Sequence, residues 1–347
     1  MPVAVITGAS AGIGRATAKA FAEAGYDVAL LARGEAGLKA AAAEIEATGQ
    51  RALPIPTDVA VYDQVEAAAA RAEAELGEID VWVNDAMTTV FAPSWEVDAP
   101  SFQRAVEVTF LGQVWGTTAA LARMRPRDRG TIVNIGSAMA FIGIPLQSAY
   151  CASKFACRGY FESVRAELLH TGSNVVMTMV HMPAVNTPQF DWCETTLDHH
   201  PQPVPPIYQP EVCARAIVAA AIDGRRAKVV GSWNKMLVGL ASLMPGLANQ
   251  YAARGAWDTQ LTSQKIDPST RQANLHSPVD DDQDAGAHGI FDSKARGFWD
   301  PSFLKTLPTS AKTFVDATSA VWKEKAGRYR RQADQIAGDR TAPASGR

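Results

Sequence analysis

The stretch Val3-Ala-Val-Ile-Thr-Gly-Ala-Ser-Ala-Gly-Ile-Gly14 decides the fold of this chain. Its apolar start predicts a buried parallel strand, and its three glycines predict a tight turn. An alanine-rich segment at 15–24 follows and predicts a helix. Glycine lets backbone approach a ligand closely, and a helix N-terminus offers N–H groups and positive potential to a pyrophosphate. The string therefore predicts a dinucleotide-binding turn, although its spacing is G-x-x-x-G-x-G rather than the general G-x-G-x-x-G.

Strands and helices are predicted to alternate from this stretch onward. The predicted strands are 3–6, 27–31, 52–56, 81–84, 131–135, 175–180 and 228–230. The predicted helices are 15–24, 35–48, 62–76, 100–123, 149–170 and 211–222. This alternation is typical of a doubly wound α/β fold of the Rossmann type, with a parallel sheet of about seven strands and helices on both faces. Ligands of such folds bind outside the carboxyl ends of the strands.

A second signal is the string NIGSAMAFIGIPLQSAYCASK at 134–154. Tyr150 and Lys154 are four residues apart, so they share one face of a predicted helix. An ammonium group near a phenol favours the phenolate and lowers its pKa toward the working pH, as a proton donor and acceptor requires. Ser137 precedes this helix and could hold the reacting oxygen. A solvated helix face is the alternative for a tyrosine–lysine pair considered alone.

Together these motifs resemble the short-chain dehydrogenase/reductase family in its classical form. The resemblance implies an NAD(P)-binding catalytic domain at 1–231, in which Ser137 and Tyr150 polarise a carbonyl and Tyr150 transfers the proton. It also implies that Lys154 lowers the pKa of the tyrosine and binds the nicotinamide ribose. The residues predicted to bind the cofactor are Gly8, Ser10, Gly12, Ile13, Gly14, Arg33, Asp58, Val59, Asn84, Ala86, Tyr150, Lys154, Pro183, Val185 and Thr187.

The chain departs from the family pattern at several positions. Thr109 stands where the family has a catalytic asparagine, and a hydroxyl lacks the separate donor and acceptor of an amide. We predict that Thr109 holds a water of the proton relay, with a relay that runs differently as the alternative. The family's N-N-A-G motif is only partly matched at 84–87, and Ala184 replaces a glycine beside Pro183. His181 could face the nicotinamide pocket, or it could be a histidine satisfied by backbone at the end of a strand.

Arg33 narrows the choice of cofactor. The second strand ends without the acidic residue that would accept a hydrogen bond from an adenosine ribose 2′-hydroxyl, and Arg33 stands there instead. A guanidinium suits a 2′-phosphate through charge-assisted, bidentate hydrogen bonds. We therefore predict NADP(H) in preference to NAD(H). A solvated arginine on a loop before a helix is the alternative.

Three stretches of variable sequence are predicted to line or cover the substrate pocket: 88–95, 138–147 and 187–210. The last is long for a connection, and long loops in compact domains are often lids. These stretches carry Phe141, Ile142, Ile144, Pro145, Phe190 and Trp192. They predict a small-molecule carbonyl or alcohol substrate that is largely apolar. Ordinary packing of the loops against the core is the alternative.

Composition excludes several other classes of protein. The formal net charge of −3 over 347 residues gives no sign of nucleic-acid binding. No apolar run reaches the length of a transmembrane helix, no signal peptide is evident, and the four cysteines have no metal-binding spacing. We expect a cytoplasmic protein without a metal, assembled as a homodimer or homotetramer.

Residues 232–347 form an extension beyond the common core of the family. The segment 235–253 predicts two helices broken at Pro245-Gly246, packed on the core or on a partner subunit, with a membrane-surface helix as the alternative. Residues 262–308, which include Asp280 to Asp284, predict an irregular solvated stretch. A terminal helix is predicted at 313–336, before a disordered tail.

We predict an NADP(H)-dependent oxidoreductase that interconverts an alcohol and a ketone or aldehyde by hydride transfer. One alternative is a catalytically weak, NADP-binding regulatory or assembly protein that acts through its extension. Retention of Ser137, Tyr150 and Lys154 together argues against it. Another is an isomerase or dehydratase with a bound nicotinamide, which the glycine spacing disfavours. A panel of ketones and aldehydes mixed with NADPH separates these hypotheses.

Overall fold

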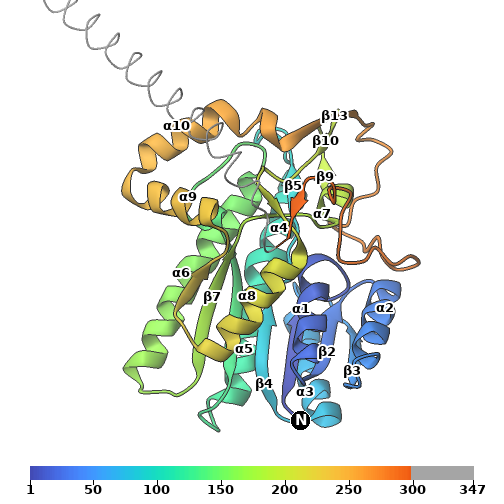
Figure 1. Ribbon diagram of the computed structural model, residues 1–347, viewed down its shortest axis with the longest axis vertical. Helices are drawn as coiled ribbons and strands as arrows, with labels where there is room; N and C mark the ends of the chain where they lie inside the picture. Colours follow the sequence, from blue (N-terminus) through green and yellow to red (C-terminus); the bar gives the residue numbers. More distant parts are fainter. Residues whose placement is uncertain (298–347) are drawn as a thin grey trace, which may run out of the picture.

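A seven-stranded parallel sheet forms the centre of the protein in the computed structural model, which describes residues 1–297. The strand order is β12-β7-β6-β4-β1-β2-β3 (Figure 1). The strands are β1 (Val3–Thr7), β2 (Asp27–Ala32), β3 (Ala52–Pro56), β4 (Ile79–Asn84), β6 (Thr131–Ser137), β7 (Val176–Met182) and β12 (Ala227–Val229). The predicted doubly wound fold is confirmed, and all seven predicted strands are present.

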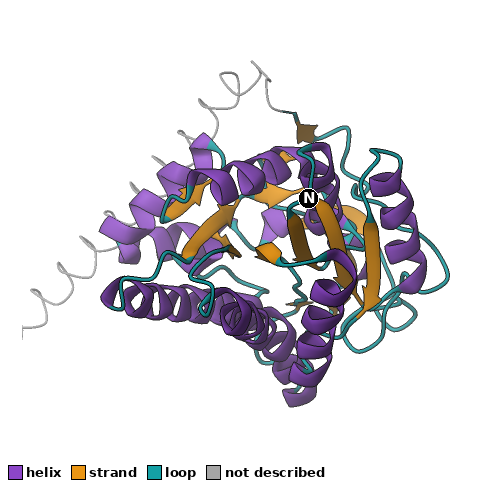
Figure 2. Cartoon of the chain, turned by 90° about the horizontal axis from the view of Figure 1, so that it is seen from below, coloured by secondary structure: helices purple, strands orange, loops and turns teal. Residues whose placement is uncertain are grey.

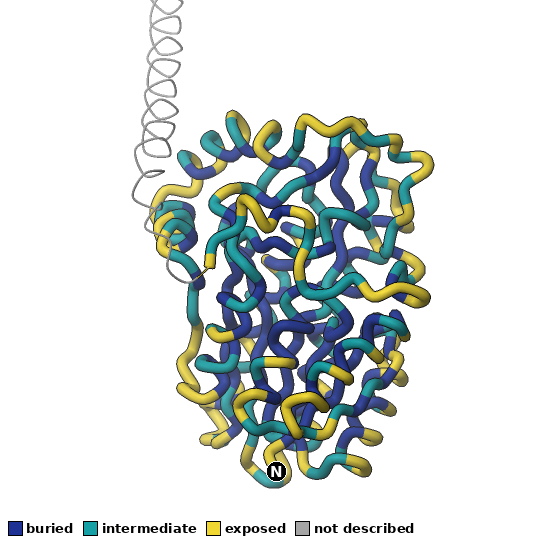
Figure 3. The backbone as a smooth tube through the Cα atoms, turned by 45° about the vertical axis from the view of Figure 1, so that its right-hand side comes forward, coloured by how far each residue is buried: buried dark blue, intermediate teal, exposed yellow. Residues whose placement is uncertain are grey.

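Helices cover both faces of this sheet (Figure 2). One layer contains α1 (Gly12–Glu23), α2 (Glu35–Glu46) and α8 (Pro210–Asp223). The other contains α3 (Tyr62–Leu76), α5 (Gly112–Met124) and α6 (Ser148–His170). Both faces of the sheet are therefore apolar: Ala4 and Ile6 pack toward the first layer, and Val5 packs toward the second. Figure 3 shows the resulting buried centre.

One predicted helix is interrupted. The segment predicted as continuous at 100–123 consists of α4 (Ala99–Val106), a π-helical turn (Glu107–Leu111) and then α5. The π turn lies where Thr109 bonds to the backbone of Thr88, so the helix departs from regular geometry at a tertiary contact. Such turns often occur at functional sites, and amphipathic periodicity alone does not reveal them.

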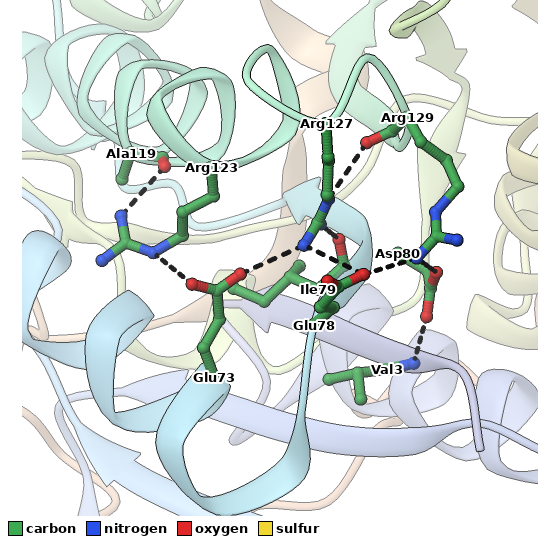
Figure 4. Close-up of polar contacts among 9 residues, drawn as sticks. All are labelled: Val3, Glu73, Glu78, Ile79, Asp80, Ala119, Arg123, Arg127 and Arg129. Carbon is green, nitrogen blue, oxygen red and sulfur yellow. Dashed lines mark hydrogen bonds and ion pairs between the residues drawn. The ribbon is translucent and has the colours of Figure 1, made fainter.

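Ion pairs tie the elements together at the amino ends of the strands, opposite the carboxyl ends (Figure 4). Arg127 lies 3.3 Å from Glu73 and 3.7 Å from Glu78, and Arg129 lies 2.6 Å from Glu78. The Val3 amide donates to Asp80 at 2.9 Å, which fixes the start of β1 beside β4. This network is separate from the carboxyl ends where ligands of this fold bind.

Short strands organise the long connection after β7. They are β5 (Val90–Phe91), β8 (Ala184–Val185), β9 (Glu194–Thr195), β10 (His199–Pro201), β11 (Ile207–Tyr208), β13 (Leu261–Lys265) and β14 (Ala295–Arg296). Strand β9 pairs with β5, and β10 pairs with β13 of the extension. A single turn, α7 (Gln189–Trp192), lies within this connection, and two short 3₁₀ turns occur at Ala138–Ala140 and Asp258–Gln260. The segment predicted as a lid is thus held by backbone pairing.

The extension begins with the two predicted helices. They are α9 (Ser232–Leu243) and α10 (Pro245–Gly255), and the break falls at Met244, before the predicted Pro245. Both pack on the loop after β6, where Ile142 shares an apolar cluster with Ala241, Ala248 and Ala252. This agrees with the expectation of helices packed on the core. The predicted helix at 313–336 and the predicted disordered tail lie outside the described residues.

Candidate active site

The glycine turn between β1 and α1 has the geometry that its sequence predicts. Gly8 and Gly12 adopt φ values of +72° and +59°, which residues with a side chain rarely do. A Cβ on Gly8 would lie 2.9 Å from the Cα of Ala86, and a Cβ on Gly14 would collide with the Gly8 carbonyl. Thr7 locks the turn by accepting hydrogen bonds from the Asp85 and Ala86 amides, both at 3.0 Å. This cradle fits the pyrophosphate of a dinucleotide.

A cavity of about 340 Å³ opens from this turn at the carboxyl ends of the strands. It brings together most residues predicted from the sequence. Those that line it are Gly8, Ser10, Gly12, Ile13, Arg33, Asp58, Val59, Ala86, Ser137, Tyr150, Lys154, Pro183, Val185 and Thr187. Gly14, Asn84 and Thr109 lie behind its wall. The glycine turn and the Ser137–Tyr150–Lys154 set therefore share one cavity.

Ser137, Tyr150 and Lys154 converge from two adjacent elements. Ser137 ends β6, and the other two lie one turn apart near the start of α6. The Lys154 ammonium is buried, donates to the Ile135 carbonyl at 2.8 Å and lies 5.6 Å from the centre of the Tyr150 ring. Tyr150 is half-buried and faces the cavity. A carbonyl placed beside Ser137 would thus meet two hydroxyl groups.

Burial dominates the electrostatics of this set. It raises the pKa of the Tyr150 phenol, while a hydrogen bond with Ser137 opposes the increase. Burial also lowers the pKa of Lys154, which the nearby Cys157 and Asp85 oppose. The sequence predicts a lysine that lowers the pKa of the tyrosine. In this structure the opposing influence on Tyr150 comes first from Ser137.

Asp85 is a buried carboxyl group that the sequence does not single out as functional. It follows β4, is 8% exposed and lines the cavity. Burial raises its pKa to about 8, and the Lys154 ammonium opposes the increase. The sequence signal that could have pointed to Asp85 is that an aspartate replaces the second asparagine of the family's N-N-A-G motif. A second ionisable group therefore lies within electrostatic reach of Lys154.

Asn84 and Thr109 have structural partners in place of cavity contacts. The Asn84 amide donates to Asn134 at 2.8 Å, and its oxygen accepts from Trp82 at 2.8 Å. The Thr109 hydroxyl donates to the Thr88 carbonyl at 2.8 Å and accepts from the Thr88 amide at 3.0 Å. Asn84 joins β4 to β6, and Thr109 fixes the loop after β4. Neither side chain lines the cavity, and the roles predicted for them in cofactor binding and in the proton relay stay predictions.

His181 lies on β7 outside the cavity and is 3% exposed. Burial lowers its pKa to about 4, although a hydrogen bond with the backbone of Ser137 opposes the decrease. Its ring packs at 4.8 Å against Phe141. The backbone of Ser137 satisfies only part of the imidazole, because its Nδ1 atom is buried without a hydrogen-bond partner. With the lowered pKa the imidazole is neutral near pH 7.

The other end of the cavity is apolar and is built partly by the extension. The predicted stretches contribute Phe91, Ile142, Ile144, Phe190 and Trp192, whereas Phe141 and Pro145 do not line it. The helices α9 and α10 add Trp233, Leu237, Tyr251 and Ala252 to this wall. Ala256, which follows α10 directly, lines it as well. The substrate end of the cavity is therefore shaped by segments far apart in the sequence.

A segment that we call the strap, residues 274–292, crosses the cofactor end. In Figure 1 it belongs to the orange trace that runs from β13 toward α1 and α2. The Arg33 guanidinium donates to the carbonyls of Asn274, Leu275 and His276. Arg104 bridges Asp58, at 2.5 Å, to the Leu275 carbonyl, at 3.1 Å. The solvated stretch expected from the sequence is thus partly a wall of the cavity.

Further along, the strap covers the starts of two helices. The Gly37 amide of α2 donates to the Asp280 carbonyl at 3.2 Å, and the Gly12 amide of α1 donates to the Gly286 carbonyl at 3.2 Å. Arg15 pairs with Asp284 of the strap and with Glu44 of α2. Composition does not reveal this role, because a run of aspartates is usually solvated.

The fold and the cavity define the class of protein: an oxidoreductase with a Rossmann-type dinucleotide site and a serine–tyrosine–lysine set. The family model for short chain dehydrogenase matches residues 2–195. The chain belongs to this family. The uncharacterized oxidoreductase YxnA of Bacillus subtilis is 33% identical over 273 residues, which cover 78% of this chain and 77% of that protein. The 3-dehydrosphinganine reductase of Danio rerio is 33% identical, over 68% of this chain and 73% of that protein.

Solved structures agree with this assignment. A metagenomic short-chain oxidoreductase in complex with NADP is 27% identical, with a TM-score of 0.55, over 66% of this chain and 95% of that one. A short chain dehydrogenase/reductase from Burkholderia phymatum in complex with NAD shares the fold at 23% identity, with a TM-score of 0.65, over 72% of this chain and 95% of that one. These relatives bind NADP or NAD, so the family resemblance alone does not choose between them.

Two absences hold for residues 1–297. No helix there is both long and apolar enough to cross a membrane. No group of three or more histidine, cysteine, aspartate or glutamate side chains there could hold a metal ion. The four cysteines are free and buried, and burial raises the pKa of Cys151 to about 11. The thiol of Cys151 is therefore protonated near neutral pH.

Proposed function

We propose that this oxidoreductase interconverts an alcohol and a ketone or aldehyde with a nicotinamide dinucleotide, and that Tyr150 is its acid and base. One observation carries the proposal: the glycine turn and the Ser137–Tyr150–Lys154 set line the same cavity. Residues 1–231 would supply the catalytic machinery, and the extension would complete the cavity walls. The nicotinamide supplies or accepts the hydride when it is bound.

Each residue of the set has a distinct role in this proposal. The Ser137 hydroxyl donates to the substrate oxygen and holds it beside Tyr150. Tyr150 gives its phenolic proton to that oxygen in reduction and takes it back in oxidation. A charged Lys154 ammonium favours the phenolate, and the hydrogen bond with Ser137 opposes the effect of burial on the pKa of Tyr150. Lys154 is also expected to hold the nicotinamide ribose, and Thr109 to shape the loop around the relay.

The substrate that suits the cavity is bulky and apolar. Phe91, Phe190, Trp192 and Leu237 line the end away from the glycine turn. An apolar ligand gains free energy when such surface leaves water. Similarity to a 3-dehydrosphinganine reductase supports a reductase reaction on such a substrate.

The form of the cofactor, the assembly and the location of the protein stay predictions. NADP(H) is predicted from Arg33, whose guanidinium donates to three strap carbonyls in this structure. A homodimer or homotetramer is expected, and the four cysteines, which have no metal-binding spacing, favour a reducing, cytoplasmic compartment. The alternative of a regulatory or assembly protein acting through its extension is disfavoured because the extension forms part of the cavity.

A panel of bulky apolar ketones tests the proposal. The protein is mixed with NADH or NADPH and each ketone, and the loss of nicotinamide absorbance is followed. We expect turnover with at least one bulky ketone and slower turnover with acetone. Tight cofactor binding without turnover on any carbonyl would contradict the proposal and favour the regulatory protein.

A further inference from the structure

Asp280 of the strap occupies the end of β2 where a dinucleotide-binding fold meets the adenosine ribose. Its carboxyl group lies against Gly34 and Gly37, at the start of α2. A Cβ on Gly37 would come within 2.6 Å of the Asp280 Oδ2 atom, and a Cβ on Gly34 would collide with the same carboxyl group. Both glycines leave room for a carboxylate that is donated from almost 250 residues further along the chain.

This carboxylate is buried but incompletely paired. Asp280 is 7% exposed, lines the cavity and has no hydrogen-bond partner for its Oδ2 atom. A buried carboxylate oxygen without a donor is costly, so a ligand hydroxyl that donates to it would be stabilised. Arg33, Gly34 and Asp58 line the same part of the cavity. A ligand with a hydrogen-bond donor near the Asp280 Oδ2 atom would therefore be favoured.

The neighbouring cations are already engaged. Arg33 donates to three strap carbonyls, and Arg104 pairs with Asp58 at 2.5 Å. Asp281 also lies at this point, with its Oδ1 atom 3.2 Å from the Glu35 amide. The Ala36 and Gly37 amides of α2 donate to the carbonyls of Asp281 and Asp280. The helix start is therefore occupied by the strap, which brings the Asp280 carboxyl group to the cavity wall.

We propose that Asp280 selects the cofactor by accepting a hydrogen bond from the ribose 2′-hydroxyl of NAD(H). In dinucleotide-binding folds this role belongs to an acidic residue at the end of the second strand, a position that Arg33 occupies here. A 2′-phosphate is negatively charged at neutral pH, offers acceptors only, and would meet the carboxylate of Asp280. The strap thus replaces a missing acidic residue, and the NADP(H) preference predicted from Arg33 is reversed. This inference rests on the proposed function, which assumes that the protein binds a nicotinamide dinucleotide.

Equilibrium binding tests this inference without relying on turnover. Dissociation constants for NAD⁺ and NADP⁺ are measured by calorimetry on the full chain and on Asp280→Asn, which keeps the side-chain shape. We expect the wild type to bind NAD⁺ more tightly. The variant should bind NAD⁺ about tenfold more weakly, the scale of one charge-assisted hydrogen bond, with NADP⁺ binding unchanged or tighter. Gly37→Ala, which displaces the carboxylate from the other side, should act in the same direction.

Asp282→Asn is the matched control, because it removes the same charge from an exposed position of the strap. It should leave the ratio of the two dissociation constants unchanged. A wild type that binds NADP⁺ as tightly as NAD⁺, or an Asp280→Asn variant with the wild-type ratio, would overturn the inference. Binding of neither dinucleotide would overturn the proposed function as well. Selective NAD⁺ binding without turnover would support the role of Asp280 and count against the proposed reaction alone.

Discussion

At the scale of single residues, the buried pair of Asp85 and Lys154 links the chemistry of the cavity to pH. Burial raises the pKa of Asp85 from 3.8 to about 8 and lowers the pKa of Lys154. Between pH 3.8 and about 8 the folded state therefore holds the Asp85 proton more firmly than the unfolded state does. This carboxyl group makes the fold less stable as the pH rises through that window.

Asp85→Asn should remove this dependence. Without the ionisable group, the free energy of unfolding should fall less between pH 5 and pH 8 than it does in the wild type, because no buried carboxyl has to release a proton. Urea denaturation at both pH values, without cofactor, measures the difference. Asp63→Asn on the surface of α3 is the control and should keep the wild-type slope. An Asp85→Asn variant with the wild-type slope would contradict the account of Asp85.

Tyr150→Phe separates chemistry from binding. Removing the phenolic hydroxyl should reduce kcat about 10²–10⁴-fold, the usual scale of a general acid, while the dissociation constant for the cofactor changes little. Tyr160→Phe is the control, because Tyr160 lies on the same helix but does not line the cavity. Steady-state kinetics and calorimetry on both variants check the prediction. Wild-type turnover in Tyr150→Phe would rule out Tyr150 as the acid and base.

At the scale of elements, the glycine turn between β1 and α1 is both tightly packed and the predicted binding site of the dinucleotide. Gly14→Ala places a methyl group against the Gly8 carbonyl, so the turn has to open. We expect weaker dinucleotide binding and a loss of about 1–3 kcal/mol in the free energy of unfolding, the usual scale of overpacking. Calorimetry and urea denaturation measure the two effects.

Gly159→Ala on α6 is the matched control. No atom lies within 4 Å of the position of its added Cβ, so the methyl group meets open space. The substitution should leave cofactor binding unchanged and make α6 slightly more stable, because alanine favours a helix over glycine. Equal effects of the two substitutions on cofactor binding would contradict the role given to the turn at Gly14.

The sequence was enough to predict the seven strands of the sheet, because buried parallel strands are continuous apolar runs bounded by turns. It was not enough to place every site residue. Asn84 and Thr109 sit in the expected motif positions, but their side chains bond to Asn134 and Thr88 behind the cavity wall. Motif spacing fixes a position along the chain, whereas the direction of a side chain depends on the partners that surround it.

At the scale of the whole molecule, the extension completes the cavity at both ends. The strap covers the cofactor end, and α9 and α10 close the substrate end. Neither role could be predicted from local sequence. Asp280 lies in a run of aspartates that is typical of solvated segments, and its contact with Gly34 and Gly37 depends on tertiary structure alone.

Ala252→Leu tests whether α10 forms the substrate wall. Ala252 is buried and lines the cavity, so the larger side chain should reduce the space for the substrate. We expect a higher KM for bulky ketones, about tenfold for the bulkiest, and unchanged cofactor binding. Ala253→Leu, at the next and exposed position, should leave both values unchanged. The same KM in Ala252→Leu and the wild type would show that the substrate does not reach α10.

The transfer of deuterium tests the central claim most directly. The protein is incubated with a bulky apolar ketone and a nicotinamide cofactor fully deuterated at C4, and the alcohol product is analysed by mass spectrometry. We predict an alcohol with one deuterium on the carbinol carbon, formed by the wild type and largely lost in Tyr150→Phe. Cofactor binding without any labelled alcohol, across the ketone panel, would contradict the assignment of this cavity as a hydride-transfer site.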